Sequence, residues 1–142
     1  MLKTTLVPYP EVSKALDSTS HVIIYVRDYR GEPYGTVIAM EKDQNIRYGW
    51  SLLGNNDSQK GMSFSKKLGK QYAYTRLLEC PTKEDAIKIM EPMQDHNNYD
   101  APSHLIQTMS RAGMKLKLLL ANQKVKQLQR QLTAVNIQQP FA

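Results

Sequence analysis

Apolar and polar residues alternate along three successive segments of the N-terminal half of the chain. His21–Tyr29 is rich in β-branched residues and tyrosine, and Tyr34–Met40 and Ile46–Leu53 repeat the pattern. In the third segment, even-numbered residues from Ile46 onward share one face and odd-numbered residues share the other. Turn chemistry at Arg30-Gly31-Glu32-Pro33 and polar residues 41–45 separate the segments. Three strands joined by short loops predict an antiparallel β-meander.

Helical patterns occupy the second half of the chain. Ser65 is a predicted N-cap for a helix over Lys66–Glu79, in which we expect Leu68, Tyr72 and Leu77 to face the sheet. Thr82-Lys83-Glu84-Asp85 resembles a capping box and predicts a short helix through Met90.

The longest predicted element is a helix over 103–138, which carries two apolar lines. One line contains Leu105, Met109, Ala112, Leu116 and Leu119, and the other contains Met114, Leu118, Ala121, Val125, Leu128, Leu132 and Val135. The second line steps by 4 and 3 residues, which is the heptad pattern of a coiled coil. We expect the first line to pack on the sheet and the second on another copy of the chain. The alternative is a single amphipathic core helix that breaks near Asn122.

These elements predict an α+β fold, in which an antiparallel β-meander is packed by helices and followed by a long C-terminal oligomerisation helix. We expect an N-terminal arm over 1–20, which is short and partly helical. A single α+β ligand-binding domain over 21–138 and a tail over 139–142 complete the predicted organisation.

The composition is that of a small globular protein with a basic balance. The chain has 142 residues, a formal net charge of +6 and a pI near 9.4. Such a charge is typical of a protein with an anionic partner, although it also serves solubility alone. The single cysteine, Cys80, predicts no internal disulfide. With no expected membrane span or leader, the predicted location is the cytosol, including that of an infected cell.

Catalytic and metal-binding patterns are scarce, so we expect a protein that is not an enzyme and needs no metal or cofactor. The histidines His21, His96 and His104 have no metal-ligand spacing, and no phosphate-binding glycine motif occurs. Carboxylates cluster in predicted turns and loops, where solvated acids are common.

Basic residues supply the candidate ligand-binding groups. Lys66, Lys67, Lys70 and Arg76 lie along the first predicted helix, where the N-terminus favours an anion. Arg27 lies on a tyrosine-rich strand, and Arg111 lies on the long helix near its second apolar line. A guanidinium there is suited to a phosphate, or to a carboxylate in a salt bridge between subunits.

The polar loop before the long helix adds two further candidates. Tyr99 can stack on a base, and the amide of Asn97 can bind a purine edge. A tyrosine that closes a loop over the core is the alternative.

Several motifs together resemble a family of small phage proteins. They are Tyr25-Val26-Arg27-Asp28 with Arg30-Gly31, Pro33, Gly35, Val37 and Ala39, then Gly49-Trp50-Ser51-Leu52, then Phe64-Ser65-Lys66-Lys67-Leu68-Gly69-Lys70 with Ala73 and Arg76, and finally Met109-Ser110-Arg111-Ala112. The pattern, from about Val22 to Leu119, is similar to that of the phage Thoeris anti-defence sponges of the first type.

The resemblance implies a sponge, which binds a cyclic nucleotide immune signal without cleaving it. The ligand would be glycocyclic ADP-ribose or a related signal, including cyclic oligonucleotides, in the cytoplasm of an infected bacterial host. It also implies a homo-oligomer, a dimer or a hexamer, with Arg111 as the best supported ligand-binding residue. The N-terminal arm, the loop Gly54–Gly61 and the extension past Leu120 depart from the family pattern.

A second class of function remains open. The long helix carries Lys115, Lys117, Lys124, Lys126 and Arg130, which suits a nucleic-acid-binding accessory protein. The same lysines also suit the exposed face of a coiled coil.

Overall fold

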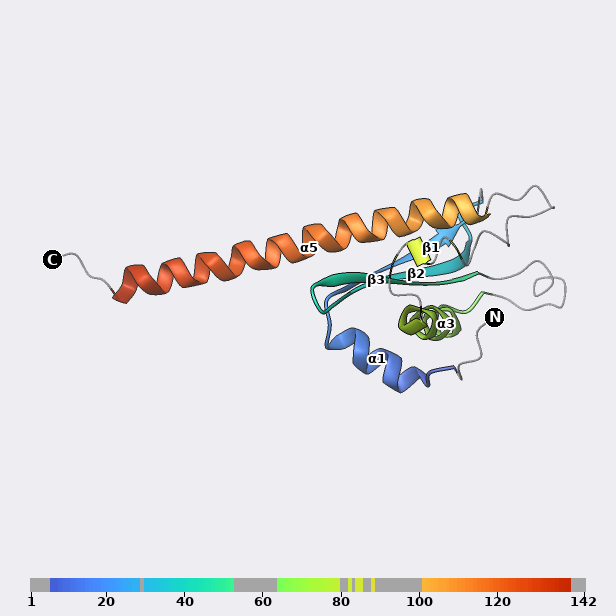
Figure 1. The fold of residues 1–142 in the computed structure, drawn as a ribbon, viewed down its shortest axis with the longest axis horizontal. Helices are drawn as coiled ribbons and strands as arrows, with labels where there is room; N and C mark the ends of the chain where they lie inside the picture. The colour runs from blue at the N-terminus through green and yellow to red at the C-terminus, as the bar shows by residue number, and fades with distance from the viewer. Residues whose placement is uncertain are drawn as a thin grey trace.

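A computed structural model describes residues 6–28, 30–52, 64–79, 82, 84, 85, 88 and 101–138, with the side chains of the last segment described from 104 to 135 (Figure 1). It confirms the predicted α+β fold, in which helices pack on an antiparallel meander and the last helix is long.

The sheet contains β1 (His21–Arg27), β2 (Pro33–Lys42) and β3 (Asn45–Leu52) in the order β1-β2-β3. All neighbouring strands are antiparallel, and Ile24 pairs with Val37, which pairs with Trp50. The second strand is longer than predicted because the turn after it contains only Asp43 and Gln44, whose φ angles are 53° and 69°. Two residues with positive φ form the tight hairpin turn that matches the twist of the strands.

Helices cover both faces of the sheet (Figure 1). On one face lie α1 (Tyr9–Asp17) and α3 (Lys66–Glu79), and on the other lies α5 (Ala101–Gln138). The predicted N-terminal arm therefore contains a helix, and its Val12 and Leu16 are buried against the sheet and α3. The arm contributes to the hydrophobic core rather than standing apart from it.

The contact between α3 and the sheet is closer than the sequence predicts. Gly69, Ala73 and Leu77 are buried on the sheet side of the helix, whereas Tyr72 is 43% exposed, so the prediction for Tyr72 is wrong. The reason is Gly49 of β3, where an added Cβ would overlap the backbone carbonyl of Ala73. Small residues at this crossing let the helix and the strand approach until their backbones touch.

Side chains cap two of the predicted helix starts. The Ser65 hydroxyl accepts a hydrogen bond from the Leu68 N–H at 3.1 Å, and the Thr82 hydroxyl accepts one from the Asp85 N–H at 3.1 Å. Each hydroxyl satisfies one of the amide groups that the first turn of a helix leaves without a partner. Both predicted N-caps are confirmed.

The first apolar line of α5 packs on the sheet as predicted, except for Leu119, which is exposed. Leu105, Met109, Ala112 and Leu116 are fully buried and form a cluster with the sheet residues Ile24, Val26, Val37, Ala39, Tyr48 and Trp50. The helix continues without a break to Gln138, as predicted, so the alternative of a core helix that breaks near Asn122 is wrong. From Ala121 to Val135 every side chain is exposed, and this half of α5 projects beyond the sheet (Figure 1).

Tyr48 lies in close contact with α5. Its side chain is buried, and a Cβ added to Gly113 would overlap its hydroxyl group. Burial raises the pKa of Tyr48 above its ordinary value of 10.0, and the nearby Glu84 carboxylate adds to that effect. The neutral phenol is therefore the form that the folded protein favours.

Gly49→Ala is expected to lower the free energy of unfolding by about 1–3 kcal/mol, because the added methyl group has to displace the backbone of α3. Urea denaturation monitored by circular dichroism measures this change. Lys124→Ala, on the exposed half of α5, is the control and should change stability by less than about 0.5 kcal/mol. Equal stabilities of the two variants would contradict the close crossing at Gly49.

Stability is expected to fall as the pH rises above about 10, through the raised pKa of Tyr48. The unfolded chain loses the Tyr48 proton first, so deprotonation favours unfolding, whereas the contribution is fully present below pH 10. Denaturation curves measured between pH 8 and pH 11 should therefore show a steeper loss of stability for the unmodified chain than for Tyr48→Phe. Parallel pH profiles would argue against the burial of this phenol.

Candidate anion-binding groove

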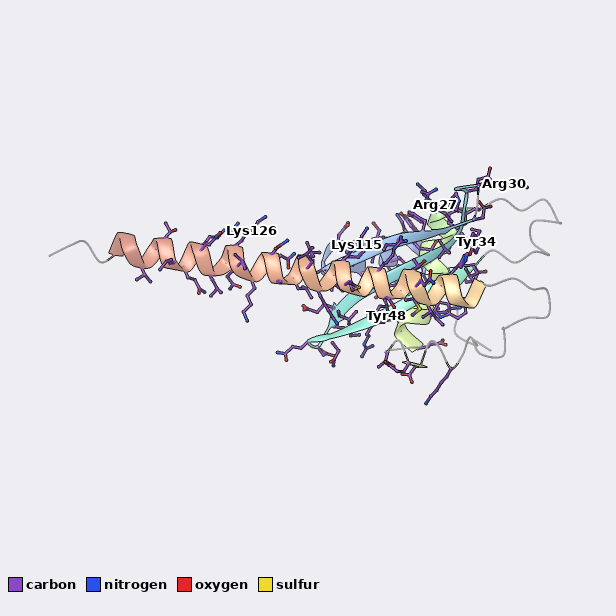
Figure 2. All side chains as sticks on the ribbon, turned by 90° about the horizontal axis from the view of Figure 1, so that it is seen from above. Arg27, Arg30, Tyr34, Tyr48, Lys115 and Lys126 are labelled. Carbon is purple, nitrogen blue, oxygen red and sulfur yellow. The ribbon has the colours of Figure 1, made fainter. Side chains whose placement is uncertain are left out.

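A groove of about 440 Å³ runs between β1, an edge strand of the described sheet, and one flank of α5. The strand contributes Ile23, Ile24, Tyr25, Val26 and Arg27, and the helix contributes His104, Gln107, Thr108, Arg111 and Lys115. Two of the residues predicted from the sequence, Arg27 and Arg111, thus line one recess although they are 84 positions apart. In Figure 2, Arg27 and Lys115 lie on the same side of α5, and Tyr48 lies on the opposite side.

The helix side of the groove follows from the rotation of α5. His104, Thr108, Arg111 and Lys115 are spaced by 4, 3 and 4 residues, so they form one line along the helix. The fully buried Leu105 and Ala112 are each one position further along the chain from His104 and Arg111, which is about 100° around the helix. Packing of the buried line on the sheet therefore turns the His104–Lys115 line toward β1.

The strand side of the groove ends at Arg27, whose position is fixed by the turn that follows it. The Asp28 carboxylate accepts hydrogen bonds from the N–H groups of Arg30 at 2.8 Å and Glu32 at 3.0 Å. The closed turn presents the Gly31 carbonyl, which accepts a hydrogen bond from the Arg27 guanidinium at 2.8 Å. A guanidinium has five N–H donors, so one bond to the turn orients Arg27 and leaves others for a ligand.

The charged residues that are described along the groove have one sign. Arg27, Arg111 and Lys115 are cationic, and no acidic side chain among the described residues lines the recess. A larger recess of about 920 Å³ lies on the opposite flank of α5, but Glu41 and Glu84 face it together with basic residues. The groove along β1 is therefore the described recess better suited to an anion.

The other basic candidates belong to α3, on the opposite face of the sheet, and three of them lie beside aromatic rings. Lys66 Nζ lies 5.0 Å from the centre of the Tyr25 ring, and Lys67 Nζ lies 5.1 Å from that of Tyr9. Both distances fit cation–π contacts. Neither Lys66 nor Lys67 lines the groove.

Arg76 has a structural position that was not predictable from its place in the sequence. Its guanidinium carbon lies 4.1 Å from the centre of the Trp50 ring, and it donates a hydrogen bond to the Trp50 carbonyl at 3.1 Å. Arg76 thus joins α3 to the outer strand β3, on the far side of the sheet from β1. Lys70, on the same helix, is half-buried and does not line the groove either.

The candidates Asn97 and Tyr99 lie outside the described residues, as does Cys80. Among the residues that are described, no three histidine, cysteine or acidic side chains gather where they could hold a metal ion. None of the described helices has the combination of length and apolar character needed to cross a membrane.

Comparisons with family models, with curated proteins and with solved structures find no match to this chain. The groove must therefore be interpreted from its own chemistry.

Three groove residues are not among the ligand-binding residues predicted from the sequence. The sequence indicates His104 only as a metal ligand to be excluded and Lys115 only as part of a basic helix, and it gives Thr108 no role. Their spacing relative to Arg111 contains the signal, because residues 104, 108, 111 and 115 fall on one helix face. The sequence does not show that β1 is the edge strand that lies beside this face of α5.

Proposed function

We propose that the protein is a phage sponge that binds a cyclic nucleotide immune signal and sequesters it without cleaving it. The signal is glycocyclic ADP-ribose or a related cyclic nucleotide, and its loss blocks anti-phage defence in the cytoplasm of the infected bacterial host. One observation supports the proposal most strongly: Arg27 and Arg111, both in motifs that resemble the sponge family, line one groove with Lys115.

The size and chemistry of the groove suit such a ligand. A volume of about 440 Å³ falls within the range of small-molecule sites. Arginine forks bind phosphate oxygens through paired hydrogen bonds, and Lys115 adds a point charge for a diphosphate. As an edge strand of the described sheet, β1 offers backbone groups for the base and the ribose hydroxyls.

Binding without cleavage is consistent with the same lining. Hydrolysis of a phosphate ester needs a metal ion or an acid and base pair placed at the reacting bond. The described lining of the groove offers one imidazole, His104, and no carboxylate. We therefore assign the groove a binding role and propose that the protein is not an enzyme.

Arg111→Ala is expected to weaken binding of cyclic ADP-ribose or its glycocyclic form about 10- to 100-fold, because one charge-assisted hydrogen-bonding group is lost. Isothermal titration calorimetry measures the change. Lys124→Ala removes one positive charge from the exposed half of α5, outside the groove, and serves as the matched control. Equal affinities of these two variants would remove Arg111 from the site, and no binding by the unmodified chain would contradict the proposal.

The bound signal is expected to be released intact when the protein is denatured by heat. Chromatography of the supernatant, compared with ligand heated alone, measures the recovered fraction. Recovery of a linear or shortened product in proportion to incubation time would instead show that the protein is an enzyme.

A nucleic-acid-binding accessory protein is the second candidate, favoured by the basic residues on the exposed half of α5. Lys124, Lys126 and Arg130 are exposed there, and this part of the helix projects away from the sheet (Figure 2 labels Lys126). This function requires mobility shifts with DNA or RNA that weaken steeply as salt increases. The sponge proposal predicts no shift with either nucleic acid at 150 mM salt.

A further inference from the structure

The second apolar line of α5, here called the outer seam, is exposed in the single chain. It contains Met114, Leu118, Ala121, Val125, Leu128, Leu132 and Val135. Met114, Leu118 and Leu132 are 68%, 62% and 61% exposed. Monomeric proteins normally expose apolar residues singly, whereas these residues form one continuous line in a heptad pattern.

The outer seam faces directly away from the sheet. Met114 and Leu118 each follow a fully buried residue, Ala112 and Leu116, by two positions. Two positions correspond to about 200° around a helix, so the two lines lie on opposite sides. A partner can therefore lie along the seam without meeting the sheet beneath α5.

We propose that a second copy of this chain covers the outer seam, with the two α5 helices antiparallel. In this pairing Leu118 lies against the partner's Val135, Ala121 against the partner's Leu132, and Val125 against the partner's Leu128. The paired region extends from Lys115 to Gln138 on each helix, which is about 36 Å. This pairing does not depend on what the groove binds.

Charge favours the antiparallel direction. No acidic residue occurs between 101 and 138, so the helix cannot neutralise its own cations. Arg111 lies three positions before Met114, so it is the next seam position toward the N-terminus. In a parallel pair the two Arg111 side chains would therefore face each other. In the antiparallel pair Arg111 lies beyond the end of the partner helix.

The helix ends support the same direction. The last turn of α5 contains no basic residue to offset the partial negative charge of its carbonyl groups. Antiparallel pairing places that end beside Lys115 and Lys117 of the other copy. Each copy then supplies basic side chains to the C-terminal end of the other helix.

Side-chain volumes also favour this pairing. Each antiparallel layer joins a larger residue to a smaller one, as in Ala121 with the partner's Leu132. A parallel pair would place two copies of Ala121 together and leave a gap between two larger layers. Moving the antiparallel register by one heptad would press the groove residue Arg111 against the partner's Val135, so the unshifted register is the better one.

Cysteine cross-linking tests direction and register together. Ala121→Cys and Leu132→Cys chains, each also carrying Cys80→Ser, are co-expressed and equilibrated with oxidised glutathione. A disulfide-linked dimer of the two different chains is expected. Neither variant alone should cross-link, because positions 121 and 132 are about 16 Å apart along a helix axis.

A cross-link formed by Ala121→Cys alone would show a parallel pair and overturn the proposal. A cross-link between Ala121→Cys and Val125→Cys chains would show the shifted register and overturn it likewise.

Native mass spectrometry tests the seam itself. Leu128→Asp, which alters an exposed side chain and leaves the core intact, is expected to raise the dimer dissociation constant at least about 100-fold, because it buries an unpaired charge. Gln127→Asp adds the same charge outside the seam and should leave a dimer. A monomeric unmodified chain at micromolar concentration, or equal dissociation of both variants, would overturn the proposal.

Discussion

The packing of Leu105, Met109, Ala112 and Leu116 on the sheet fixes the rotation of α5, and both proposed surfaces depend on that rotation. Once this line is buried, the His104–Lys115 flank has to face β1 and the outer seam has to face solvent. The contact of Tyr48 with Gly113 limits how far the helix can shift on the sheet. Burial of a few apolar side chains thereby positions cations that lie outside the core.

The groove needs a second constraint, which comes from the turn after β1. Asp28 closes that turn through two backbone hydrogen bonds, and the turn carbonyl of Gly31 holds Arg27. Arg27 and Arg111 are thus oriented by separate parts of the fold. Both guanidinium groups line one recess, and the charge of each would attract a phosphate bound there.

Much of the fold could be predicted from the sequence because its signals are local. Alternation predicts the three strands, side-chain hydroxyls predict the caps at Ser65 and Thr82, and heptad spacing predicts the continuous long helix. The contact face of α3 could not be predicted, because its position depends on the close approach at Gly49 rather than on the apolar residues of the helix. A glycine in a sequence does not indicate which element it contacts, because that depends on the residues beside it in the fold.

The site could be predicted only in part for the same reason. Arg27 and Arg111 are identifiable as candidates, but their common groove depends on which strand forms the sheet edge. The roles of Lys66 and Arg76 could not be predicted, because a ring from a distant segment occupies each cation. Charge along a sequence indicates which groups could bind an anion, and packing decides which of them face a recess.

A crystal structure of the protein with bound cyclic ADP-ribose or its glycocyclic form tests the central claim most directly. The account predicts that the diphosphate lies between Arg27 and Arg111, in the groove along β1. A ligand bound instead in the recess on the opposite flank of α5, beside Glu41 and Glu84, would contradict it.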